Sequence, residues 1–419
     1  MIAVRPLRRC DATLSVPGSK SYTHRALIVA ALSQGESVLL NALRSDDTDC
    51  TAQALRDLGI PMCWEEDRIH VWGGRERLRP PNEALFCGAS GTSMRFLTAV
   101  AALVKGRTTL VGSERMKERP MTDLFSGLAQ MGVKARSWEE DDALKVLVES
   151  QGIDGGEVAV KGTASSQFLS ALLMVAPYAK EDVRLEIVDS LVSKPYVEVT
   201  LDVMKAFGAV VEREGENRFL VVSGRGYRPR IYSIEADASS ASYFFAAAAV
   251  TKGRVKIMGL NPHSIQADAN FLEILKRMGC DVLYRDDGVE VYGRKLQAIE
   301  MDMAAMPDLV PALAVTAAFA HGKTIIKGIG HLRHKESDRI SVVARELTKM
   351  GVAVEEGEDW LRIEGGRGHA VEIVPEGDHR IAMAFAIAGL VIPGIMIQDH
   401  ECVRKSFPGF WETFGRLYG

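Results

Sequence analysis

The sequence predicts an α/β protein of two domains, each containing three copies of one small repeated unit. A loop of small residues runs six times into an Ala-rich apolar segment, and a short strand-like stretch follows each segment. The loops begin at Gly18, Gly88, Gly162, Asp237, Pro307 and Gly377. Their spacing of about 70 to 75 residues exceeds the repeat of a solenoid. Each unit is therefore expected to be a small fold in its own right.

The second half of each unit begins with an amphipathic stretch that ends in a hydrophobic residue and a glycine. These pairs are Leu58-Gly59, Met131-Gly132, Phe207-Gly208, Met278-Gly279, Met350-Gly351 and Phe414-Gly415. Glycine suits the positive φ that commonly ends a helix. A strand, an acidic turn and a second strand follow in the first five copies. Each unit is thus predicted to run helix, strand, helix, strand, strand.

The sixth copy reaches the end of the chain without its final hairpin. Residues 1–17 contain two short strand-like stretches and are predicted to supply the missing strands. Both termini would then lie in one domain, formed by residues 1–17 and 236–419. Residues 18–235 would form the other domain, and both have the usual size of a single domain.

The Ala-rich helices are predicted to lie at the centre of their domains, because they are apolar on all sides. If three such helices pack in parallel in each domain, their N-termini gather at one end. Helix N-termini carry unpaired N–H groups and a partial positive charge. Two such ends facing each other predict an anion-binding active site in the cleft between the domains.

The residues in these loops and in the segments between units suit an anion with several charges. Arginine binds phosphate or carboxylate with two parallel hydrogen bonds, and lysine adds a compact charge. The candidate binding residues are Lys20, Ser21, Arg25, Gly91, Arg119, Ser165, Ser166, Gln167, Ser193, Tyr196, Lys335, Arg339, Arg380 and Lys405. Asp308 and Glu336 lie among these groups and are the natural acid and base.

Each motif taken alone also has a purely structural explanation. The GSKS loop lacks a complete phosphate-loop pattern and fits a capped helix start. His24 is predicted to be a hydrogen-bonded helix residue, and Asp46, Asp47 and Asp49 are predicted to cap the next helix. The charged run RHKESDR fits a surface helix start with Ser337 or Asp338 as its cap. The functional interpretation depends on these motifs occurring together, at corresponding repeat positions.

Composition narrows the class of protein. The chain has 419 residues, 25% charged residues and a net charge of -4, which argues against a nucleic-acid or membrane-surface partner. The six cysteines show no CxxC pair and no metal-ligand spacing, so buried free thiols and no metal are expected.

Residues 381–397 are uncharged, but Pro393-Gly394 interrupts them, which favours a buried helix and a strand over a membrane span. No export signal is evident at the N-terminus, so a cytoplasmic protein is expected.

Ten segments in order resemble one known family. They are PGSKSYTHRAL, GTSMRFL, RMKERPM, GTASSQFLSALLM, LVSKPYVEVTL, DASSASYF, MPDLVPALA, HKESDRI, EGDHRIAMAFA and VRKSFPGF. These segments resemble the 5-enolpyruvylshikimate-3-phosphate synthase family, whose members are 3-phosphoshikimate 1-carboxyvinyltransferases. The resemblance covers residues 15–410, which is nearly the whole chain.

This resemblance implies a fold and a reaction. Each domain would contain three βαβαββ units around buried parallel helices, as in the inside-out barrel of enolpyruvyl transferases. The chain would transfer the enolpyruvyl group of phosphoenolpyruvate to the 5-hydroxyl of shikimate 3-phosphate and release phosphate, a step toward chorismate and the aromatic amino acids. It would need neither a metal nor an organic cofactor, would act as a monomer, and would close its domains over both substrates.

The resemblance also implies a role for each candidate residue. Lys20 would touch both substrates, Asp308 would accept the 5-hydroxyl proton, and Glu336 would protonate the methylene carbon. The implied contacts of shikimate 3-phosphate are Lys20, Ser21, Arg25, Ser165, Ser166, Gln167, Ser193, Tyr196, Asp308 and Lys335. The implied contacts of phosphoenolpyruvate are Lys20, Gly91, Arg119, Gln167, Arg339, Arg380 and Lys405.

Some residues depart from the best-known branch of the family, and two other functions remain open. Ala89, Phe96 and His331 stand where Asn, Pro and Asn can occur. The nearest alternative is a UDP-N-acetylglucosamine 1-carboxyvinyltransferase, which usually carries a cysteine shortly before the arginine matching Arg119; VGSERMKER has none. A non-catalytic sugar-phosphate binding protein is the other alternative, although it would not need the acid pair Asp308 and Glu336.

Overall fold

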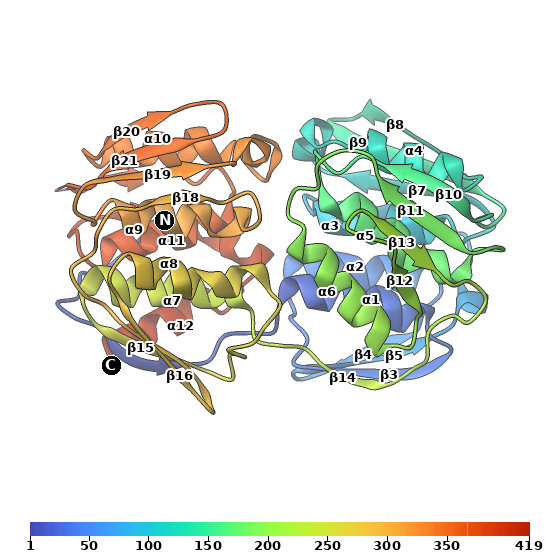
Figure 1. The fold of residues 1–419 in the computed structure, drawn as a ribbon, viewed down its shortest axis with the longest axis horizontal. Coiled ribbons are helices and arrows are strands. Elements are labelled where there is room, and N and C mark those ends of the chain that lie inside the picture. The colour runs from blue at the N-terminus through green and yellow to red at the C-terminus, as the bar shows by residue number, and fades with distance from the viewer. Residues whose placement is uncertain (367) are drawn as a thin grey trace. The chain divides into compact units, whose positions relative to one another are not determined.

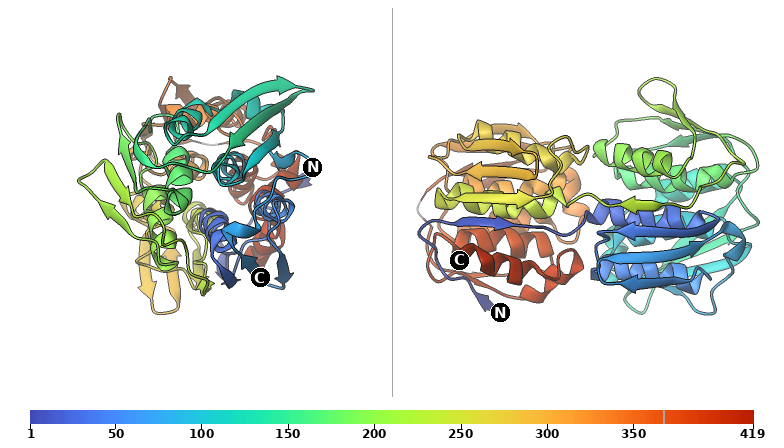
Figure 2. Two further views of the ribbon diagram at one scale, coloured as in Figure 1. Left: turned by 90° about the vertical axis from the view of Figure 1, so that its right-hand side faces the viewer. Right: turned by 90° about the horizontal axis from the view of Figure 1, so that it is seen from below.

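The computed structural model describes residues 1–366 and 368–419. Contacts divide the chain into two compact units (Figures 1 and 2). Unit 1 contains Met1–Pro17 and Glu235–Gly419, and unit 2 contains Gly18–Ile234. Both termini therefore belong to unit 1.

Unit 2 contains three repeats, each with its own sheet. The first comprises α1 (Lys20–Leu32), β3 (Gly35–Leu40), α2 (Asp46–Asp57), β4 (Met62–Glu65), β5 (Arg68–Gly73) and, from the end of the unit, β14 (Ile231–Ser233). The second comprises β6 (Leu85–Gly88), α3 (Gly91–Ala101), β7 (Gly106–Gly112), α4 (Thr122–Gln130), β8 (Lys134–Glu140) and β9 (Ala143–Ser150). The third comprises β10 (Gly156–Val160), α5 (Ser166–Val175), β11 (Val183–Ile187), α6 (Pro195–Ala206), β12 (Val211–Arg213) and β13 (Arg218–Val221).

Unit 1 repeats the same order. Its first repeat comprises β2 (Asp11–Leu14), α7 (Ala238–Thr251), β15 (Arg254–Met258), α8 (Phe271–Arg277), β16 (Asp281–Arg285) and β17 (Gly288–Tyr292). The next comprises β18 (Glu300–Asp302), α9 (Val310–Ala317), β19 (Lys323–Lys327), α10 (Arg339–Lys349), β20 (Ala353–Glu356) and β21 (Leu361–Glu364). The last comprises β22 (Glu372–Ile373), α11 (His379–Gly389), β23 (Met396–Ile397), α12 (Phe410–Gly415) and β1 (Ile2–Ala3).

Every four-stranded sheet has the same topology, which confirms the α/β repeat. In the sheet β10-β11-β13-β12, β10 runs parallel to β11, and β13 pairs antiparallel with both β11 and β12. The sheets contain three or four strands, and none of those in the described residues closes on itself. No single sheet in the described part of the chain therefore forms a barrel.

The prediction for residues 1–17 is half right. β1 pairs antiparallel with β23 and so completes the sixth repeat. β2, in contrast, runs parallel to β15 and is the first strand of the fourth repeat, with Leu14 opposite Ile257. An ion pair of 3.0 Å between Arg254 and Asp11 joins these two strands. The pairing partner of a short strand depends on long-range register, which the local pattern does not contain.

Apolar helices occupy the centre of each unit, as predicted. Every residue of α11 is buried, and so is every residue of α7 except Ser239. In unit 1, α7, α9 and α11 lie side by side, with the sheets outside them (Figure 1). A helix that is apolar all round has no face to offer to water, so only its ends reach the surface of the unit.

The glycines that end the second helices of the first five copies adopt a positive φ, as predicted. Gly59, Gly132, Gly208, Gly279 and Gly351 have φ between 80° and 102°. Gly415, in the sixth copy, has φ of -57°. The chain turns directly into a 3-10 helix (Arg416–Tyr418) there and does not reverse into a strand.

The uncharged run at residues 381–397 forms most of α11 and then β23. Among the described residues, no helix has both the length and the hydropathy needed to span a membrane.

The pairing of β2 with β15 predicts a clear stability difference between two neighbouring residues. Leu14 is 3% exposed and Thr13 is exposed. Leu14→Ala should lower the free energy of unfolding by roughly 2 to 4 kcal/mol, because it leaves a cavity in the core of unit 1. Thr13→Ala, the control, should change it by less than about 0.5 kcal/mol. Urea denaturation followed by circular dichroism measures both, and equal effects would contradict the observed pairing.

Candidate active site

In unit 2, serines precede the three central helices. Ser19, Ser90 and Ser165 occupy the N-cap positions of α1, α3 and α5. Ser90 accepts a hydrogen bond of 3.2 Å from the backbone N–H of Ser93, and Ser165 accepts one of 3.2 Å from Gln167. A serine cap satisfies one N–H group without adding negative charge. The positive ends of these helices therefore keep their attraction for anions.

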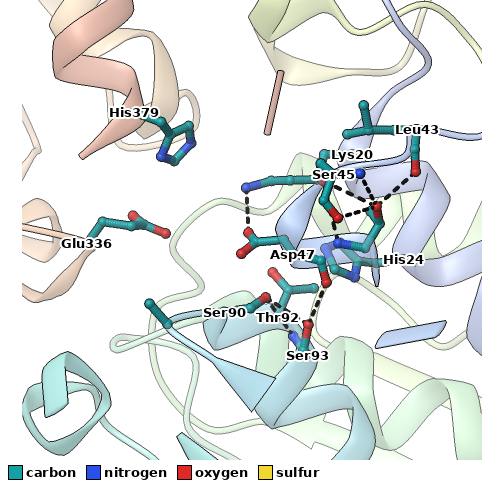
Figure 3. A network of polar contacts seen from close by, with 12 residues as sticks. Lys20, His24, Leu43, Ser45, Asp47, Ser90, Thr92, Ser93, Glu336 and His379 are labelled. Atoms are coloured by element: carbon teal, nitrogen blue, oxygen red, sulfur yellow. Dashed lines mark hydrogen bonds and ion pairs between the residues drawn. The ribbon is translucent and has the colours of Figure 1, made fainter. Parts of the chain in front are cut away.

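Lys20 opens α1 and forms an ion pair with Asp47. The distance between Lys20 Nζ and Asp47 Oδ2 is 3.1 Å, and the side chains are 15% and 6% exposed (Figure 3). The prediction that Asp46, Asp47 and Asp49 cap the helix after this loop is wrong, because Ser45 caps α2 in a capping box with Thr48. Asp47 instead places the ammonium group of Lys20 at the start of α1.

A buried chain of hydroxyl groups joins the starts of α1, α2 and α3 (Figure 3). His24 Nδ1 lies 2.9 Å from Thr51 Oγ1, which lies 2.9 Å from Ser93 Oγ. Ser93 Oγ also lies 3.1 Å from the carbonyl oxygen of Asp47. This confirms the prediction that His24 is a hydrogen-bonded helix residue. The chain holds the Lys20–Asp47 pair against the start of α3.

Arg95 joins the starts of α3 and α5. Its guanidinium donates to Gln167 Oε1 at 2.7 Å, Ser165 Oγ at 3.3 Å and the carbonyl oxygen of Pro120 at 3.0 Å. Gln167 in turn donates to Thr92 Oγ1 at 3.0 Å. The sequence places Arg95 with Gly91 and Thr92 at the second loop, among the residues that suit an anion, but predicts no specific contact for it. The contacts by which it joins α3 and α5 are seen only in the structure.

Gly91 lies directly beneath the guanidinium of Arg119. A Cβ atom added to Gly91 would lie 2.5 Å from Arg119 Cζ, which is closer than any ordinary contact. Arg119 also donates a hydrogen bond of 3.2 Å to the carbonyl oxygen of Ala89. The missing side chain at Gly91 thus allows a cationic group to lie over the start of α3.

Arg25, like Arg95, is surrounded by protein groups. It is 2% exposed and donates to Thr200 Oγ1 at 2.7 Å and to the carbonyl oxygens of Ser21 at 2.9 Å and Tyr196 at 3.0 Å. Burial lowers the pKa of Arg25 to about 10. These bonds tie α1 to α6. They also place the predicted ligands Ser21 and Tyr196 around one fixed charge.

The predicted phosphate serines lie at the start of α5 and just before α6. Ser166 is 3% exposed and Ser193 is 7% exposed. Ser193 has a φ of 54°, which is uncommon for a residue with a side chain. Such strain often accompanies functional sites.

In unit 1, one guanidinium binds three carboxylates. Arg339 is 1% exposed and lies 2.8 Å from Asp378, 2.9 Å from Asp308 and 2.7 Å from Glu336. Burial alone would lower the pKa of Arg339, but the charges of Asp378, Glu336 and Asp308 outweigh it and raise that pKa above its ordinary value. The second oxygen of Asp308 accepts a bond of 2.7 Å from Arg380. Both acid–base candidates therefore share one arginine.

Aspartates precede the central helices of unit 1, where unit 2 has serines. Asp237 caps α7 and Asp378 caps α11, while Asp308 lies in a 3-10 helix (Pro307–Leu309) that leads into α9. Asp338 caps α10 and accepts from the backbone N–H of Ser341 at 3.1 Å, so of the two predicted caps Asp338 is the correct one. Unit 1 thus combines carboxylates with arginines at the ends of its helices.

Three further groups complete the polar end of unit 1. Lys405 ends a 3-10 helix (His400–Lys405) and is 9% exposed, and Lys335 caps another (Gly330–His334). Burial, followed by the charge of Lys335, lowers the pKa of His331 to about 4. His331 is therefore neutral at neutral pH. A neutral ring at this place adds no charge to the cations around it.

The predicted site residues form two groups, one in each unit. Unit 2 holds Lys20, Ser21, Arg25, Gly91, Arg119, Ser165, Ser166, Gln167, Ser193 and Tyr196. Unit 1 holds Asp308, Lys335, Glu336, Arg339, Arg380 and Lys405. Unit 2 presents cations and hydroxyl groups at helix starts, whereas unit 1 presents paired carboxylates and cations. The first arrangement suits binding of an anion, and the second suits proton transfer.

Comparison with known proteins identifies the family. The model of the EPSP synthase family, described as 3-phosphoshikimate 1-carboxyvinyltransferase, matches residues 4–414. The chain belongs to this family. A 3-phosphoshikimate 1-carboxyvinyltransferase of Methanoculleus marisnigri is 46% identical over 98% of this chain and 96% of the relative. One of Syntrophobacter fumaroxidans is 45% identical over 99% of both chains.

Solved structures agree with this assignment. An EPSP synthase from Acinetobacter baumannii has a TM-score of 0.83 and 30% identity, and the match covers 99% of this chain and 97% of that one. The enolpyruvyl transferase NikO from Streptomyces tendae has a TM-score of 0.78 at 18% identity, covering 99% and 96% of the two chains. The second likeness concerns the fold alone.

The Arg339 cluster predicts a measurable contribution of Asp378 to stability. Asp378 is fully buried, and its carboxylate accepts from Arg339 and Ser337. Asp378→Asn should lower the free energy of unfolding by roughly 1 to 3 kcal/mol, because hydrogen bonds to a charged group are lost in a dry interior. Asp286→Asn, at an exposed turn, is the control and should have little effect. Thermal denaturation measures both, and an unchanged Tm in Asp378→Asn would contradict this account.

Proposed function

We propose that the two units bind phosphoenolpyruvate and shikimate 3-phosphate between them, and that Asp308, Glu336 and Lys20 carry the chemistry. As a member of its family, the chain is a transferase. It moves the enolpyruvyl group of phosphoenolpyruvate to the 5-hydroxyl of shikimate 3-phosphate and releases phosphate, a step of the shikimate pathway.

The observation that supports these roles best is the pairing of Asp308 and Glu336 with one buried guanidinium. Arg339 and Arg380 both donate to Asp308, which favours the ionised carboxylate that a base requires. The phosphate and carboxylate of the donor substrate would bring negative charge toward Glu336. Like charges favour the protonated form of a carboxyl group, and that form is the one an acid requires.

The proton movements then balance. Asp308 takes the proton of the 5-hydroxyl, while Glu336 gives a proton to C3 of phosphoenolpyruvate and so makes C2 electrophilic. The hydroxyl oxygen bonds to C2 and forms a tetrahedral intermediate. The bond from C2 to the phosphate oxygen then breaks, and the methyl group returns a proton to the enzyme, aided by Lys335. The surrounding cations stabilise the charge of the intermediate.

The binding roles follow the difference between the units. Serines and Gln167 at the start of α5, with Ser193 and Tyr196 near α6, would hold the 3-phosphate and ring of shikimate 3-phosphate. Ser21 and Arg25 would hold its carboxylate. Phosphoenolpyruvate would lie between Gly91 and Arg119 of unit 2 and Arg339, Arg380 and Lys405 of unit 1. Lys20, placed by Asp47, would touch both substrates.

We further propose that the chain acts in the cytoplasm, where both substrates would be small soluble anions. It would act as a monomer there, without nucleic acid, membrane or metal. The net charge of -4 is consistent with the absence of a nucleic-acid partner.

Phosphate release tests this function directly. The purified protein is mixed with both substrates without added metal, and phosphate is measured over time. Release that requires both substrates supports the proposal. No release, with binding of shikimate 3-phosphate seen by calorimetry, would favour a non-catalytic binding protein. Turnover with UDP-N-acetylglucosamine in place of shikimate 3-phosphate would favour the related transferase.

Loss of the proposed base should separate catalysis from binding. Asp308→Ala should lower kcat by at least about a hundredfold, because general base catalysis contributes roughly 10²–10⁴-fold. Its Kd for shikimate 3-phosphate, measured by calorimetry, should stay within about threefold. Asp302→Ala, an exposed residue of β18, is the control. A near-normal kcat in Asp308→Ala would remove Asp308 from proton transfer.

Removal of the Arg119 guanidinium, which lies over Gly91, should weaken the binding of phosphoenolpyruvate and not that of shikimate 3-phosphate. Arg119→Ala should raise the KM for phosphoenolpyruvate by at least about tenfold, because truncating a charged contact to a bound anion costs on the order of 2 kcal/mol. The KM for shikimate 3-phosphate should change much less. Arg107→Ala, whose side chain is 77% exposed, is the control. Equal effects on the two KM values would assign Arg119 a general structural role.

A further inference from the structure

A fully buried carboxylate on α10 has no role in the mechanism above. The side chain of Glu346 is 0% exposed, although a glutamate is almost never fully buried without a partner. Neither the repeat pattern nor the family resemblance singled out this residue. Replacing a buried ion pair with apolar residues is often neutral for stability. Core packing by itself therefore does not explain why this position carries a charge.

The two oxygens of this carboxylate accept hydrogen bonds from different directions. Oε1 of Glu346 accepts one of 2.8 Å from Arg345 Nε, and Oε2 accepts one of 3.2 Å from the backbone N–H of Val374. Lys349 Nζ donates to both oxygens, at 2.9 and 3.0 Å. Glu346 thus joins α10 to a segment that lies 28 residues further along the chain.

Arg345, whose side chain is 41% exposed, contacts the same segment from the surface. Its guanidinium donates a hydrogen bond of 3.1 Å to the carbonyl oxygen of Val374 and another to the carboxylate of Glu376. Val374 follows directly after β22, which ends at Ile373. The N–H and the C=O of Val374 are therefore both bonded to side chains of α10.

These side chains hold a tight turn, residues 374–378, which we call the turn segment. The N–H of Asp378 donates to the carbonyl oxygen of Pro375 at 3.0 Å, and the two residues between them, Glu376 and Gly377, have φ of 53° and 70°. A positive φ is uncommon for a residue with a side chain such as glutamate. Such a conformation persists only where the surrounding structure holds it, and the contacts from α10 do so here.

The turn segment leads directly into groups of the candidate site. Asp378 caps α11 and accepts a hydrogen bond of 3.0 Å from the backbone N–H of Arg380. Asp378 pairs with Arg339 at 2.8 Å, and Arg380 pairs with Asp308 at 2.7 Å. A continuous series of contacts therefore runs from Glu346, through the turn segment, to the proposed base.

We propose that Glu346 is a positioning residue, which fixes the turn segment and thereby sets the places of Asp378 and Arg380 in the candidate site. Arg345 assists it from the surface. This inference rests on the proposed function, in which Arg339 and Arg380 bind phosphoenolpyruvate. Glu346 is fully buried, so it acts through the turn segment and touches neither substrate. A misplacement of about 1 Å at a binding group can cost up to about 100-fold in rate.

Replacement of Glu346 by glutamine tests this role with little change in volume. Glutamine has one acceptor oxygen, so it cannot accept from both Arg345 and Val374. Glu346→Gln should therefore raise the KM for phosphoenolpyruvate by roughly tenfold. The KM for shikimate 3-phosphate should stay within about twofold, because most of its proposed contacts lie in unit 2. A merely structural role would lower the amount of folded enzyme and leave both KM values unchanged, which would overturn the proposal.

Two surface variants keep the test decisive if Glu346→Gln fails to fold. Arg345→Ala and Lys349→Ala each remove one cation from the same carboxylate, but of the two only Arg345 bonds to the turn segment in the described structure. Arg345→Ala should raise the KM for phosphoenolpyruvate at least about threefold, and Lys349→Ala, the matched control, should leave it unchanged. Equal effects of the two variants would overturn the proposal. Glu355→Gln, at an exposed glutamate paired with Arg362, controls for the glutamine substitution.

Hydrogen exchange in the free protein separates this inference from the proposed function. Deuterium uptake, measured by mass spectrometry, reports how firmly the backbone of residues 374–380 is held. In Glu346→Gln these amides should exchange at least about tenfold faster, while those of α7 stay protected. Unchanged exchange, or equal acceleration in α7, would overturn the positioning role even in an active enzyme. Faster exchange confined to residues 374–380, in a protein that releases no phosphate, would support the role while the proposed function fails.

Discussion

The burial of uniformly apolar helices is the constraint on which the rest of this structure depends. All residues of α11 and all residues of α7 except Ser239 are buried. Such helices require cover on every side, which the small sheets of the repeats provide. Only the helix ends then remain available for polar chemistry. The functional groups of each unit are accordingly found where helices begin, together with the charged segments that join one repeat to the next.

The two units use this shared architecture for different chemistry. Serine caps in unit 2 leave the helix starts positive, and Lys20, Arg95 and Arg119 add cations there. Unit 1 has Asp237 and Asp378 at corresponding caps, and its Arg339 and Arg380 are paired with the carboxylates of Asp308, Glu336 and Asp378. The same repeat therefore provides an anion-binding surface in one unit and a charged network suited to proton transfer in the other.

Several local features could be predicted because their causes are local. Five of the six helix-ending glycines adopt the expected positive φ, and Asp338 caps its helix through its own first turn. The predictions that were wrong concern residues whose structural role depends on a partner far away in the sequence. Asp47 lies in a helix start that could hold a cap, but Ser45 takes that role and Asp47 pairs with Lys20, 27 residues away. Residues 11–14 form a strand as expected, yet the strand joins β15.

The sequence by itself determined the repeats, the apolar helices, the family and most of the charged groups, because periodicity and motif order are properties of the chain. The tertiary structure decided which charges share a partner. Arg339 pairs with Asp308, Glu336 and Asp378, which come from three separate segments of the chain. Electrostatic coupling depends on distance and burial, and neither quantity can be read from positions along a sequence.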